Sequence, residues 1–392
     1  MNVSEICSDL VKIRSENPPG KTAEVADYIG DFLEKKGLKY KSTDDGAGRC
    51  NIYTDYKKRP LLFSGHLDVV PAIDEGWNKK PFSGEISGGF VYGRGSTDMK
   101  GGCASILYSI SKTIEDGFDL PCNLCFVCDE ENGGKAGIQF LLAKKIIHPC
   151  DCIIAEPTPH LNPAIGQKGL LRMKINFTGV PGHGSLYPAV GVSAIMNASK
   201  FLDSVKRLYC KTFSCSPDIE EIIARSSRVL SKLFGISNAE EVLKKVTYNP
   251  GKITGGEEMN ITAQKCTLEL ETRIPWGCST GYVKNELYKS CQSFEIKVHE
   301  ESDPNITHPD SKLVKTVCRE VERVYESKPC PIVQWAASDA RYLRKSGFNV
   351  LEYGPGDIKT IHGINEKVSA DDLFKATEIY SGVLKSYMQV KL

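Results

Sequence analysis

The sequence predicts an α/β fold: a mixed or largely parallel sheet between layers of helices, with a second, α+β domain inserted into it. Three observations lead to this fold class. At 392 residues the chain is longer than one ordinary hydrophobic core needs, so two domains are expected. Before about residue 170, short apolar runs alternate with helical runs, as in α/β sheets. Beyond that point the strand patterns alternate polar with apolar residues, which is typical of a half-exposed sheet.

The first part of the chain supplies the alternating helices and strands. Apolar residues at helical spacing cover residues 3–13 and 22–36, and Gly37 follows the second segment as an expected C-cap. The remaining segments are strands at 60–64, 123–128 and 152–155 and helices at 101–114 and 136–146. Open sheets of this kind collect ligands outside the carboxyl ends of their strands. Residues at these ends are therefore the first candidates for a functional site.

The second part of the chain changes character. A strand pattern at 170–179 precedes an amphipathic helical pattern at 191–208. The segments after it are a polar helical stretch at 216–246, strands at 267–275 and 293–301, a helix at 311–325 and short apolar strands within 332–362. We therefore expect one discontinuous domain made of residues 1–170 and 302–392, and one inserted domain made of residues 171–301.

Composition excludes several classes of partner. The hydrophobic fraction of 41% and the charged fraction of 25% are those of a soluble globular protein. The net charge is +1, and no dense tract of Lys and Arg is present, so bulk charge attracts neither nucleic acid nor anionic lipid. The sequence has no apolar run long enough to span a bilayer and no signal peptide. We expect a soluble cytoplasmic protein with no nucleic-acid or membrane partner.

The cysteines are predicted to form no disulfide framework, and the tightest set of them is predicted to be reduced and buried. There are fifteen, an odd number, scattered through a long chain, unlike the disulfide framework of a small secreted domain. Cys122, Cys125 and Cys128 have the spacing of a zinc knuckle. Their segment has a strand pattern, however, and residues three apart on a strand point to opposite faces. Packing in the core is therefore the expected role of these three side chains.

Two candidate groups precede or follow glycine-rich turns in the first half of the chain. His66 and Asp68 lie two apart in SGHLDVVP, so they face the same side of a strand end and the aspartate can orient the imidazole. Asp98 lies in YGRGSTDMKGG before a helix. Each has a structural alternative, because a lone histidine can be a satisfied core residue and an aspartate at this position can be a helix N-cap.

Three further groups also follow apolar runs. Glu130 and Glu131 come directly after LCFVCD, and adjacent carboxylates beside a buried strand repel each other unless a cation or proton lies between them. A solvated charge pair is the alternative. Glu156 follows IIA, and His362 follows the loop EYGPGD. Two histidines and several carboxylates at the ends of separate strands are the ligand set of two divalent cations, a set that suits zinc.

Six ordered motifs then identify a family. HLDVVP, GRGSTDMKGG, DEENGG, AEPT, PGHGS and IHGINE resemble those of the co-catalytic zinc amidohydrolases. That family includes succinyl-diaminopimelate desuccinylase, acetylornithine deacetylase, aminoacylase and glutamate carboxypeptidase. The motifs extend over nearly the whole chain. The resemblance implies a zinc-peptidase-like catalytic domain, with a mixed sheet between helices, and an inserted α+β domain that acts as a lid and dimerisation domain.

The resemblance also implies a role for each residue. By this match, His66 and Glu156 hold one zinc and Glu131 and His362 the other. Asp98 bridges both ions. The match makes Glu130 the general base, makes Asp68 the partner that orients His66, and makes His183, in PGHGS, a histidine that stabilises the oxyanion in the partner subunit of a homodimer. The alternative for His183 is a loop histidine bonded to its own backbone turn.

The implied substrate is an N-acyl amino acid with a free carboxylate. Asn260 and Arg273 resemble the residues by which the desuccinylase holds substrate carboxylates, although Arg273 also fits a surface ion pair at a strand end. Ser338, in SDARYL, likewise resembles a desuccinylase residue, whereas GPGD at 354–357 is more similar to the deacetylase. Glu156 favours acyl-amino-acid hydrolysis, because the dipeptidases and aminopeptidases of the family tend to carry aspartate there.

The expected activity is therefore amide hydrolysis that depends on two Zn²⁺ per chain, for which Co²⁺ or Mn²⁺ can substitute. N-succinyl-diaminopimelate is the leading substrate. Acetylornithine deacetylase, or a zinc carboxypeptidase or dipeptidase, is the alternative within the class. A metal-binding homologue without turnover is the alternative of another class, and the presence of Glu130 argues against it.

Overall fold

The computed structural model describes residues 1–289 and 293–388, which fall into two compact units. Unit 1 is assembled from three segments, Met1–Ile165, Thr307–Ile332 and Ser338–Leu392. Unit 2 comprises Gly166–Ile306 and Val333–Ala337. Both units mix helices with strands, so the predicted α/β fold with an inserted α+β domain is confirmed.

Unit 1 contains a mixed sheet with the strand order β1-β2-β6-β3-β7-β15-β8. The strands are β1 (Lys41–Asp44), β2 (Cys50–Tyr53), β3 (Leu61–His66), β6 (Cys122–Val127), β7 (Asp151–Ile154), β8 (Ala164–Gln167) and β15 (Asn349–Glu352). The four central strands, β6, β3, β7 and β15, are parallel. Strands β1, β2 and β8 pair antiparallel with their neighbours.

The register of the parallel strands brings their carboxyl ends to one edge of the sheet. His66, the last residue of β3, lies opposite Val127 at the end of β6. Ser64 in β3 lies opposite Ile154 at the end of β7, which in turn lies opposite Glu352 at the end of β15. Because four chain segments leave the sheet at this edge, the side chains that follow them can meet there.

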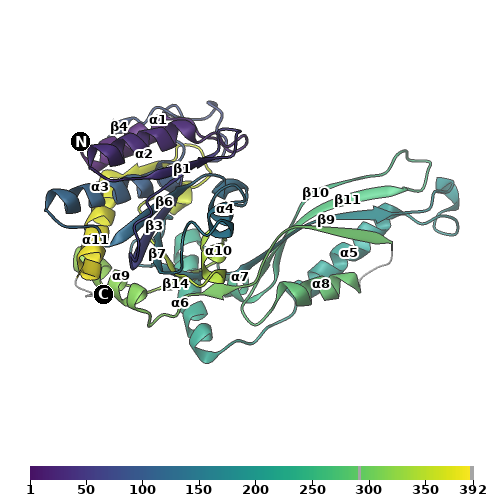
Figure 1. The fold of residues 1–392 in the computed structure, drawn as a ribbon. Helices are drawn as coiled ribbons and strands as arrows, with labels where there is room; N and C mark the ends of the chain where they lie inside the picture. The colour runs from purple at the N-terminus through teal and green to yellow at the C-terminus, as the bar shows by residue number, and fades with distance from the viewer. Residues whose placement is uncertain (290–292, 389–392) are drawn as a thin grey trace. The chain divides into compact units, whose positions relative to one another are not determined.

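Helices cover both faces of this sheet. They are α1 (Val3–Lys12), α2 (Ala23–Lys35), α3 (Gly101–Glu115), α4 (Ile138–Ala143), α9 (Lys312–Tyr325), α10 (Ala340–Lys345) and α11 (Ala370–Met388). Figure 1 shows α3 and α11 together on one side of the sheet and α4 and α10 together on the other. Gly37 follows α2 with φ +73°, which confirms the predicted glycine cap in the left-handed region.

Three helical features differ from the sequence-based expectation. Helix α4 is shorter than the predicted 136–146, because Lys145 takes a left-handed conformation with φ +54° and ends the helical path. Helix α10 interrupts a segment that was predicted to form only strands. Helix α11 was not predicted, although its buried residues recur at helical spacing. These residues are Leu373, Ala376, Thr377, Ile379, Tyr380, Val383, Leu384 and Tyr387.

A small antiparallel sheet in unit 1 joins two segments that are far apart in the sequence. It consists of β4 (Ile86–Ser87), β5 (Phe90–Tyr92) and β16 (Lys367–Ser369), in the order β16-β5-β4. Val91 lies opposite Val368 in this sheet. The loops that lead to Asp98 and away from His362 are therefore held side by side.

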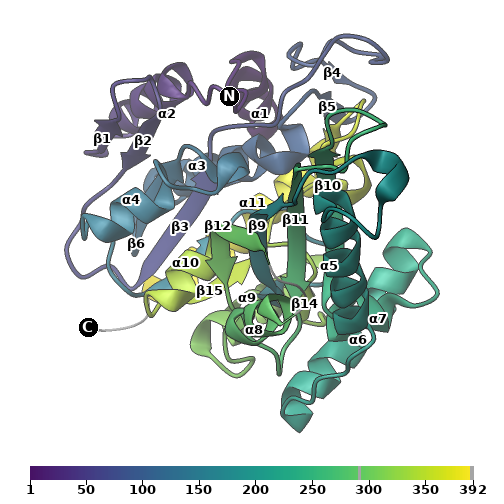
Figure 2. The ribbon, with the colours of Figure 1, turned by 90° about the vertical axis from the view of Figure 1, so that its right-hand side faces the viewer.

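Unit 2 is a four-stranded antiparallel sheet with the order β10-β11-β9-β12. The strands are β9 (Gly169–Thr178), β10 (Thr247–Gly255), β11 (Lys265–Ile274) and β12 (Phe294–Ser302), and the helices are α5 (Ala194–Tyr209), α6 (Pro217–Phe234), α7 (Ala239–Lys244) and α8 (Thr280–Tyr288). The short strand β13 (Asn305–Ile306) pairs with the end of β8, and β14 (Ile332–Gln334) pairs with β8 as well. Figure 2 shows α6 and α7 side by side.

Alternating residues of β9 and β11 form the core of unit 2. Phe177 in β9 packs edge-on against Phe201 of α5, with their ring centroids 5.5 Å apart. Phe201 also packs against Phe294 of β12 at 5.6 Å. Val283 and Leu287 of α8 complete this cluster. The helices therefore bury one face of the sheet, as the alternation in the sequence predicted.

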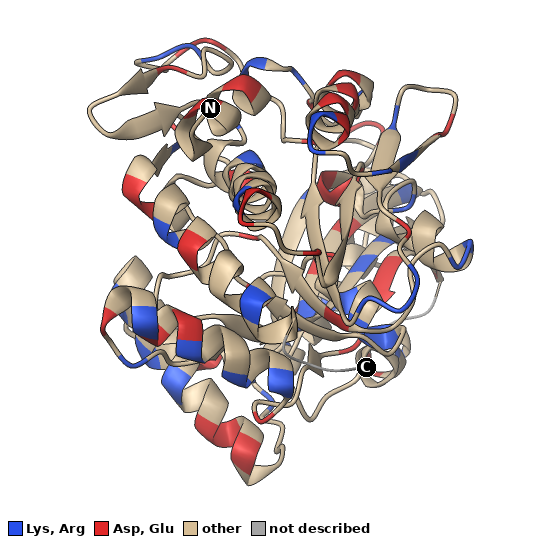
Figure 3. Ribbon diagram, turned by 60° about the vertical axis from the view of Figure 1, so that its left-hand side comes forward, with Lys and Arg blue, Asp and Glu red and all other residues tan. Residues whose placement is uncertain are grey.

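The cysteines among the described residues are free thiols. Cys122, Cys125 and Cys128 are buried on and just after β6, as predicted. Cys291 lies outside the described residues. Acidic and basic residues are interspersed along the helices in the view of Figure 3. None of the helices in the described part of the chain is both long and apolar enough to cross a bilayer.

Candidate metal site

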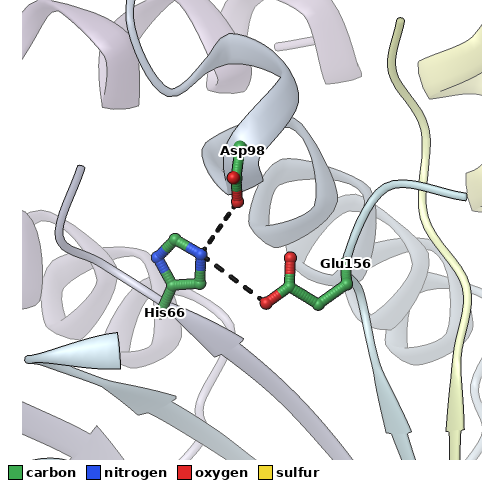
Figure 4. Close-up of side chains that lie close together, drawn as sticks. All are labelled: His66, Asp98 and Glu156. Atoms are coloured by element: carbon green, nitrogen blue, oxygen red, sulfur yellow. Dashed lines mark hydrogen bonds and ion pairs between the residues drawn. The ribbon is translucent and has the colours of Figure 1, made fainter. Parts of the chain in front are cut away.

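One group of possible metal ligands surrounds the side chain of His66 at the end of β3. Its Nε2 lies 3.0 Å from Asp98 Oδ1 and 3.7 Å from Glu156 Oε1, and Figure 4 shows the imidazole directed at both carboxylates. Its other nitrogen, Nδ1, lies 2.8 Å from the backbone oxygen of Asp68. Donation of the Nδ1 proton to that oxygen leaves Nε2 as the nitrogen that can bind a cation.

A second group shares the same aspartate. His362 Nε2 lies 3.4 Å from Asp98 Oδ2 and 3.3 Å from Glu131 Oε2. The two groups, His66–Asp98–Glu156 and Asp98–Glu131–His362, each place one ligand atom per residue within 4.8 Å of the others. Among the described residues, these are the two groups of His, Cys, Asp or Glu that could hold a metal ion, and neither contains a cysteine. Asp98 presents one carboxylate oxygen to each group.

Asp98 lies in the kinked segment Ser96–Lys100 before α3, where its own backbone is not helical (φ −119°, ψ 95°). Its carboxylate contacts the two histidines and makes no helix cap, so the N-cap alternative is wrong. The backbone N–H of Asp98 donates to Glu366 Oε1 at 3.0 Å. Asp98 is thus held by its backbone while its side chain remains available.

The carboxylate of Asp68 supports the two glutamates. Its Oδ1 accepts a hydrogen bond from the backbone N–H of Glu130, and its Oδ2 accepts one from Glu131, both at 3.1 Å. Asn17 Nδ2 donates to the same Oδ2 at 2.9 Å. The distance from Asp68 Oδ1 to His66 Nδ1 is 3.7 Å, so the imidazole is oriented by the backbone oxygen of this residue rather than by its carboxylate.

The glutamate pair is not a solvated charge pair. The side chain of Glu131 is only 7% exposed, and its Oε1 has no hydrogen-bond partner among the described atoms. Burial raises the pKa of Glu131, and the charge of Asp98 raises it further. Burial and the nearby charge of Asp339 raise the pKa of Glu130 well above its usual range. These carboxylates have too few positive partners for their number.

The remaining charges respond to the same crowding. Burial and the charge of Asp98 raise the pKa of Glu156 well above its usual range. Burial by itself would raise the pKa of Asp98, but the hydrogen bonds with His362 and His66 lower it. Hydrogen bonds with Asp98 and Glu131 raise the pKa of His362 to about 10. The histidines therefore act as the counter-cations of the cluster.

The residues fit a pair of divalent cations. Buried carboxylates that repel each other, an unpaired Glu131 oxygen and two imidazole nitrogens directed at one aspartate are the donor set that such ions need. Cations at these positions would offset the charge that the histidines now balance. The site lies at the carboxyl edge of the parallel strands, where ligands of α/β sheets bind.

The predicted residues of unit 2 lie at opposite ends of its strands. The backbone N–H of Gly184 donates to the carbonyl of Asn260 at 2.7 Å, and His183 pairs with Ile261. His183 and Asn260 are therefore neighbours, and both are exposed. Arg273 lies near the other end of β11, opposite Leu170 and eight residues beyond Lys265. At about 3.3 Å per strand residue, Arg273 is about 25 Å from the end of the sheet where His183 and Asn260 lie.

His183 and Arg273 also make the local contacts that the sequence allowed as alternatives. The hydroxyl of Ser185 lies 2.8 Å from His183 Nδ1, and the backbone N–H of Ser185 donates to the same atom at 3.3 Å. Nε2 of His183 makes no hydrogen bond within the described chain. Arg273 Nε donates to Glu271 Oε1 at 2.7 Å, while its buried Nη1 has no partner among the described residues. Each side chain keeps one donor or acceptor available.

The sequence predicted a role for Ser338 but for none of several other residues that support the site. Ser338 is buried and donates to Glu352. Next to it, burial raises the pKa of Asp339 to about 7, and neither oxygen of Asp339 has a hydrogen-bond partner among the residues that the structure describes. Arg94 and Glu366 form a buried ion pair. The motifs GRGSTDMKGG, IHGINE and SDARYL contain Arg94, Glu366 and Asp339, so motif membership was the available signal; nothing marked Asn17.

Known proteins resemble the chain throughout its length. The peptidase family M20/M25/M40 matches residues 62–386. The succinyl-diaminopimelate desuccinylase of Helicobacter hepaticus is 27% identical over 93% of this chain and 89% of its own. An uncharacterized metallohydrolase of Methanococcus maripaludis is 28% identical over 97% of this chain and 98% of its own.

Solved structures share the fold. An M20 family metallo-carboxypeptidase from Sulfolobus solfataricus superimposes with a TM-score of 0.82 over 100% of both chains, at 22% identity. A dinuclear metal-binding peptidase of the same family from Bacillus subtilis has a TM-score of 0.65 over 99% of this chain and 98% of its own, at 12% identity. At these identities the likeness establishes the architecture alone.

Proposed function

The chain belongs to the peptidase family M20/M25/M40, a family of metal-dependent hydrolases, and on that premise we propose that it is a two-metal amidohydrolase. The observation that carries the proposal is the meeting of two histidines, His66 and His362, and two glutamates, Glu131 and Glu156, around the shared Asp98, with Glu130 beside them. We assign His66, Glu156 and Asp98 to one zinc ion, and Asp98, Glu131 and His362 to the other.

Glu130 is the general base in this proposal. When bound, two divalent cations lower the pKa of a water molecule and polarise the scissile carbonyl. Glu130 takes the proton from the attacking water and delivers it to the leaving amine. Burial and the charge of Asp339 raise the pKa of its carboxyl, which suits a group that must hold a proton between these two steps. Asp68 fixes the backbone of Glu130 and thereby aims its side chain.

The proposed substrate is an N-acyl amino acid with a free carboxylate, and N-succinyl-diaminopimelate is the leading candidate. Two relatives named succinyl-diaminopimelate desuccinylase, from Helicobacter hepaticus and Nautilia profundicola, cover 93% and 99% of the chain at 27% and 25% identity. The glutamate at position 156 also supports an acyl substrate. Acetylornithine deacetylase and a carboxypeptidase or dipeptidase remain the alternatives, separated from the first by the acyl group that is released.

The protein is further proposed to be a homodimer that pairs through unit 2. Large apolar side chains are exposed around His183, at the edge of the sheet where it lies next to Asn260. They include Val180, Leu186, Val190, Val192, Ile195, Met196, Met259 and Ile261. Exposed apolar patches of this kind mark protein interfaces, and a two-fold interface is self-complementary.

This arrangement divides the substrate-binding residues between two chains. Because Asn260 and Arg273 lie at opposite ends of the strands of one sheet, a small substrate cannot touch both within one chain. We assign His183 and Asn260 to the active site of the partner, where His183 Nε2 stabilises the oxyanion. Arg273 is assigned to the carboxylate of the substrate in its own chain. Ser338 is assigned to the lining of that site.

A substrate panel tests the function. Purified protein is stripped with a chelator, reloaded with Zn²⁺, Co²⁺ or Mn²⁺, and given N-succinyl-diaminopimelate, N-acetylornithine, other acylated amino acids and dipeptides. Released amine is measured with ninhydrin. We expect turnover only after reloading, about two divalent ions per chain by metal analysis, and the fastest hydrolysis with the succinylated substrate. Full activity in a metal-free sample would contradict the proposal.

A further inference from the structure

A buried ion pair lies behind the second group of metal ligands. The side chains of Arg94 and Glu366 are 5% and 1% exposed, and Arg94 Nη1 donates to Glu366 Oε2. The other oxygen of Glu366 accepts hydrogen bonds from the backbone N–H groups of Thr97 at 2.9 Å and Asp98 at 3.0 Å. One carboxylate therefore fixes both Arg94 and the backbone that carries the shared ligand Asp98.

The guanidinium extends the same contact to the other ligand segment. Arg94 Nη2 donates to the backbone carbonyl of His362 at 3.3 Å. Its Cζ lies 5.4 Å from the centre of the Trp77 ring, which limits the rotation of the side chain. Only Arg has a planar fork that can contact Glu366 and the His362 carbonyl together. The pair thus connects the backbones of two ligands that are far apart in the sequence.

The two groups of ligands differ in what holds them. His66 and Glu156 follow β3 and β7, which are hydrogen-bonded to each other along the parallel sheet. His362 lies in a loop outside the sheet, with a left-handed φ of +58° and a side chain that is 52% exposed. The strands can hold the first group, whereas His362 depends on contacts from other loops.

We propose that Arg94 and Glu366 are a positioning pair for one metal position, the one formed by Asp98, Glu131 and His362. This inference rests on the two-metal site proposed above and adds a division of labour to it. The pair sets the separation between Asp98 and His362 before any ion arrives. Without it, the second group loses its geometry, whereas His66 and Glu156 of the first group keep the support of the sheet.

Calorimetric titration of the metal-free protein with Co²⁺ provides the test, because it reads metal affinity without any need for turnover. Glu366→Gln removes the charge and places an amide N–H₂ against donors. Arg94→Lys keeps the charge but cannot span both partners. For each variant we expect one ion per chain to bind as in the wild type and the other to bind roughly 10- to 100-fold more weakly. The wild type should bind two.

A matched control separates this effect from general loss of a buried ion pair. Arg344 is equally buried and donates to Thr307, to the Val350 carbonyl and to Glu352 in unit 1. None of these partners is a proposed ligand. Arg344→Lys should lower the thermal stability of the protein in the same way as Arg94→Lys, yet leave both cobalt affinities within about threefold of the wild type.

A double variant assigns the weakened position. His362→Ala removes a ligand of the second group, so the titration then reports the first ion. Adding Glu366→Gln to His362→Ala should change that affinity by less than about threefold, because the two substitutions act on the same position. If Glu366→Gln does not fold, Arg94→Lys takes its place in both experiments.

The outcomes are distinct. Weakening of one ion in Arg94→Lys but not in Arg344→Lys supports the positioning pair. Equal loss of both ions, unchanged binding in the Arg94 and Glu366 variants, or a further large loss in the double variant overturns it. A wild-type protein that does not bind two ions would instead overturn the proposed function.

Discussion

Unit 1 and unit 2 each contain residues that the sequence singled out, but they arrange them differently. In unit 1, His66 and His362 come from distant parts of the chain, and yet their Nε2 atoms lie 3.0 Å and 3.4 Å from the carboxylate of the shared Asp98. In unit 2, His183 and Asn260 lie in exposed loops at one end of the sheet, and Arg273 lies near the other end of β11.

The direction of the strands accounts for this difference. Parallel strands all end at one edge, so polar residues that follow them converge on one place. Antiparallel neighbours have their carboxyl ends on opposite sides of the sheet, so residues that follow them are separated by the length of a strand. Polar residues at the carboxyl ends of parallel strands can therefore come together within unit 1, whereas the predicted residues of unit 2 are held apart.

The largest expected effect concerns the general base in unit 1. Glu130→Gln should leave two metals bound and reduce turnover by about 10²–10⁴-fold, because the proton of the water has no acceptor. Glu131→Gln is the matched variant one residue away, and it should weaken metal binding because its carboxylate is assigned as a ligand. Metal analysis and amine release are measured for both. The reverse pattern would exchange the roles of the two glutamates.

A smaller effect is expected for Arg273 in unit 2. A buried contact between Arg and a carboxylate contributes about 1.5–3 kcal/mol, so Arg273→Ala should raise KM for a substrate with a free carboxylate by roughly 10- to 150-fold. The carboxamide of the same substrate should be affected far less. Arg172→Ala is the control, since Arg172 also pairs with Glu271 on this sheet. Equal effects on both substrates would place Arg273 outside the binding site.

The sequence contained most of what was needed for the metal ligands, because each follows a recognisable apolar run or lies in a motif. Periodicity shows where a strand ends but not which strands are neighbours. The convergence of His66 with Glu156 depends on the pairing of β3 with β7, which is a long-range contact. The sequence alone therefore gave the candidates, and the motifs had to supply their grouping.

Other features had no local signal. Arg94 and Glu366 are 272 residues apart, and although each lies in a motif, nothing in its local sequence indicates that the two form an ion pair. The spacing of His66 and Asp68 predicted a contact that the structure makes through the backbone oxygen, while the carboxylate supports Glu130 62 residues away. Helix α11, by contrast, had a readable apolar period. Buried polar contacts between distant segments are set by packing, which local patterns do not encode.

Recovery of activity on mixing two inactive variants would test whether unit 2 acts across the dimer. His183→Ala and Glu130→Gln are each expected to be inactive, and they are unfolded and refolded together. Half of the dimers are then mixed, and each mixed dimer has one site with both groups intact, so about a quarter of wild-type activity should return. Mixed dimers are confirmed by mass.

The matched control uses Arg273, which is assigned to its own chain. Mixing Arg273→Ala with Glu130→Gln places both defects so that no site regains Glu130 and Arg273 together. This mixture should show no gain over its parents. Recovery in the Arg273 mixture, or none in the His183 mixture, would contradict the assignment of the two edges to different chains.

The smallest expected effect lies on the surface of unit 1, close to a ligand in sequence. His160, four residues after Glu156, lies 3.1 Å from Asp372 of α11, and its ring stacks on Tyr325 at 5.5 Å. The hydrogen bond with Asp372 raises the pKa of His160 against the opposing effect of burial, and Lys375 and Asp371 are the other charges nearby. The imidazole is 45% exposed, so solvent screens the pair and limits its value to ~0.2–1 kcal/mol.

The sign of its pH dependence follows from the raised pKa. Folding favours the charged imidazole, so the stabilisation is complete below the ordinary histidine pKa of about 6.5 and disappears as the pH rises through the folded value. Urea denaturation of metal-free His160→Gln, Asp372→Asn and the double variant should give a coupling energy at pH 5.5 that falls as the pH rises through the folded pKa of His160. Metal affinity should be unchanged throughout, because β7 holds Glu156 through the sheet. A coupling energy that grows with pH would contradict the raised pKa of His160. A loss of metal in these variants would mean that the surface, rather than the parallel strands, holds this half of the site.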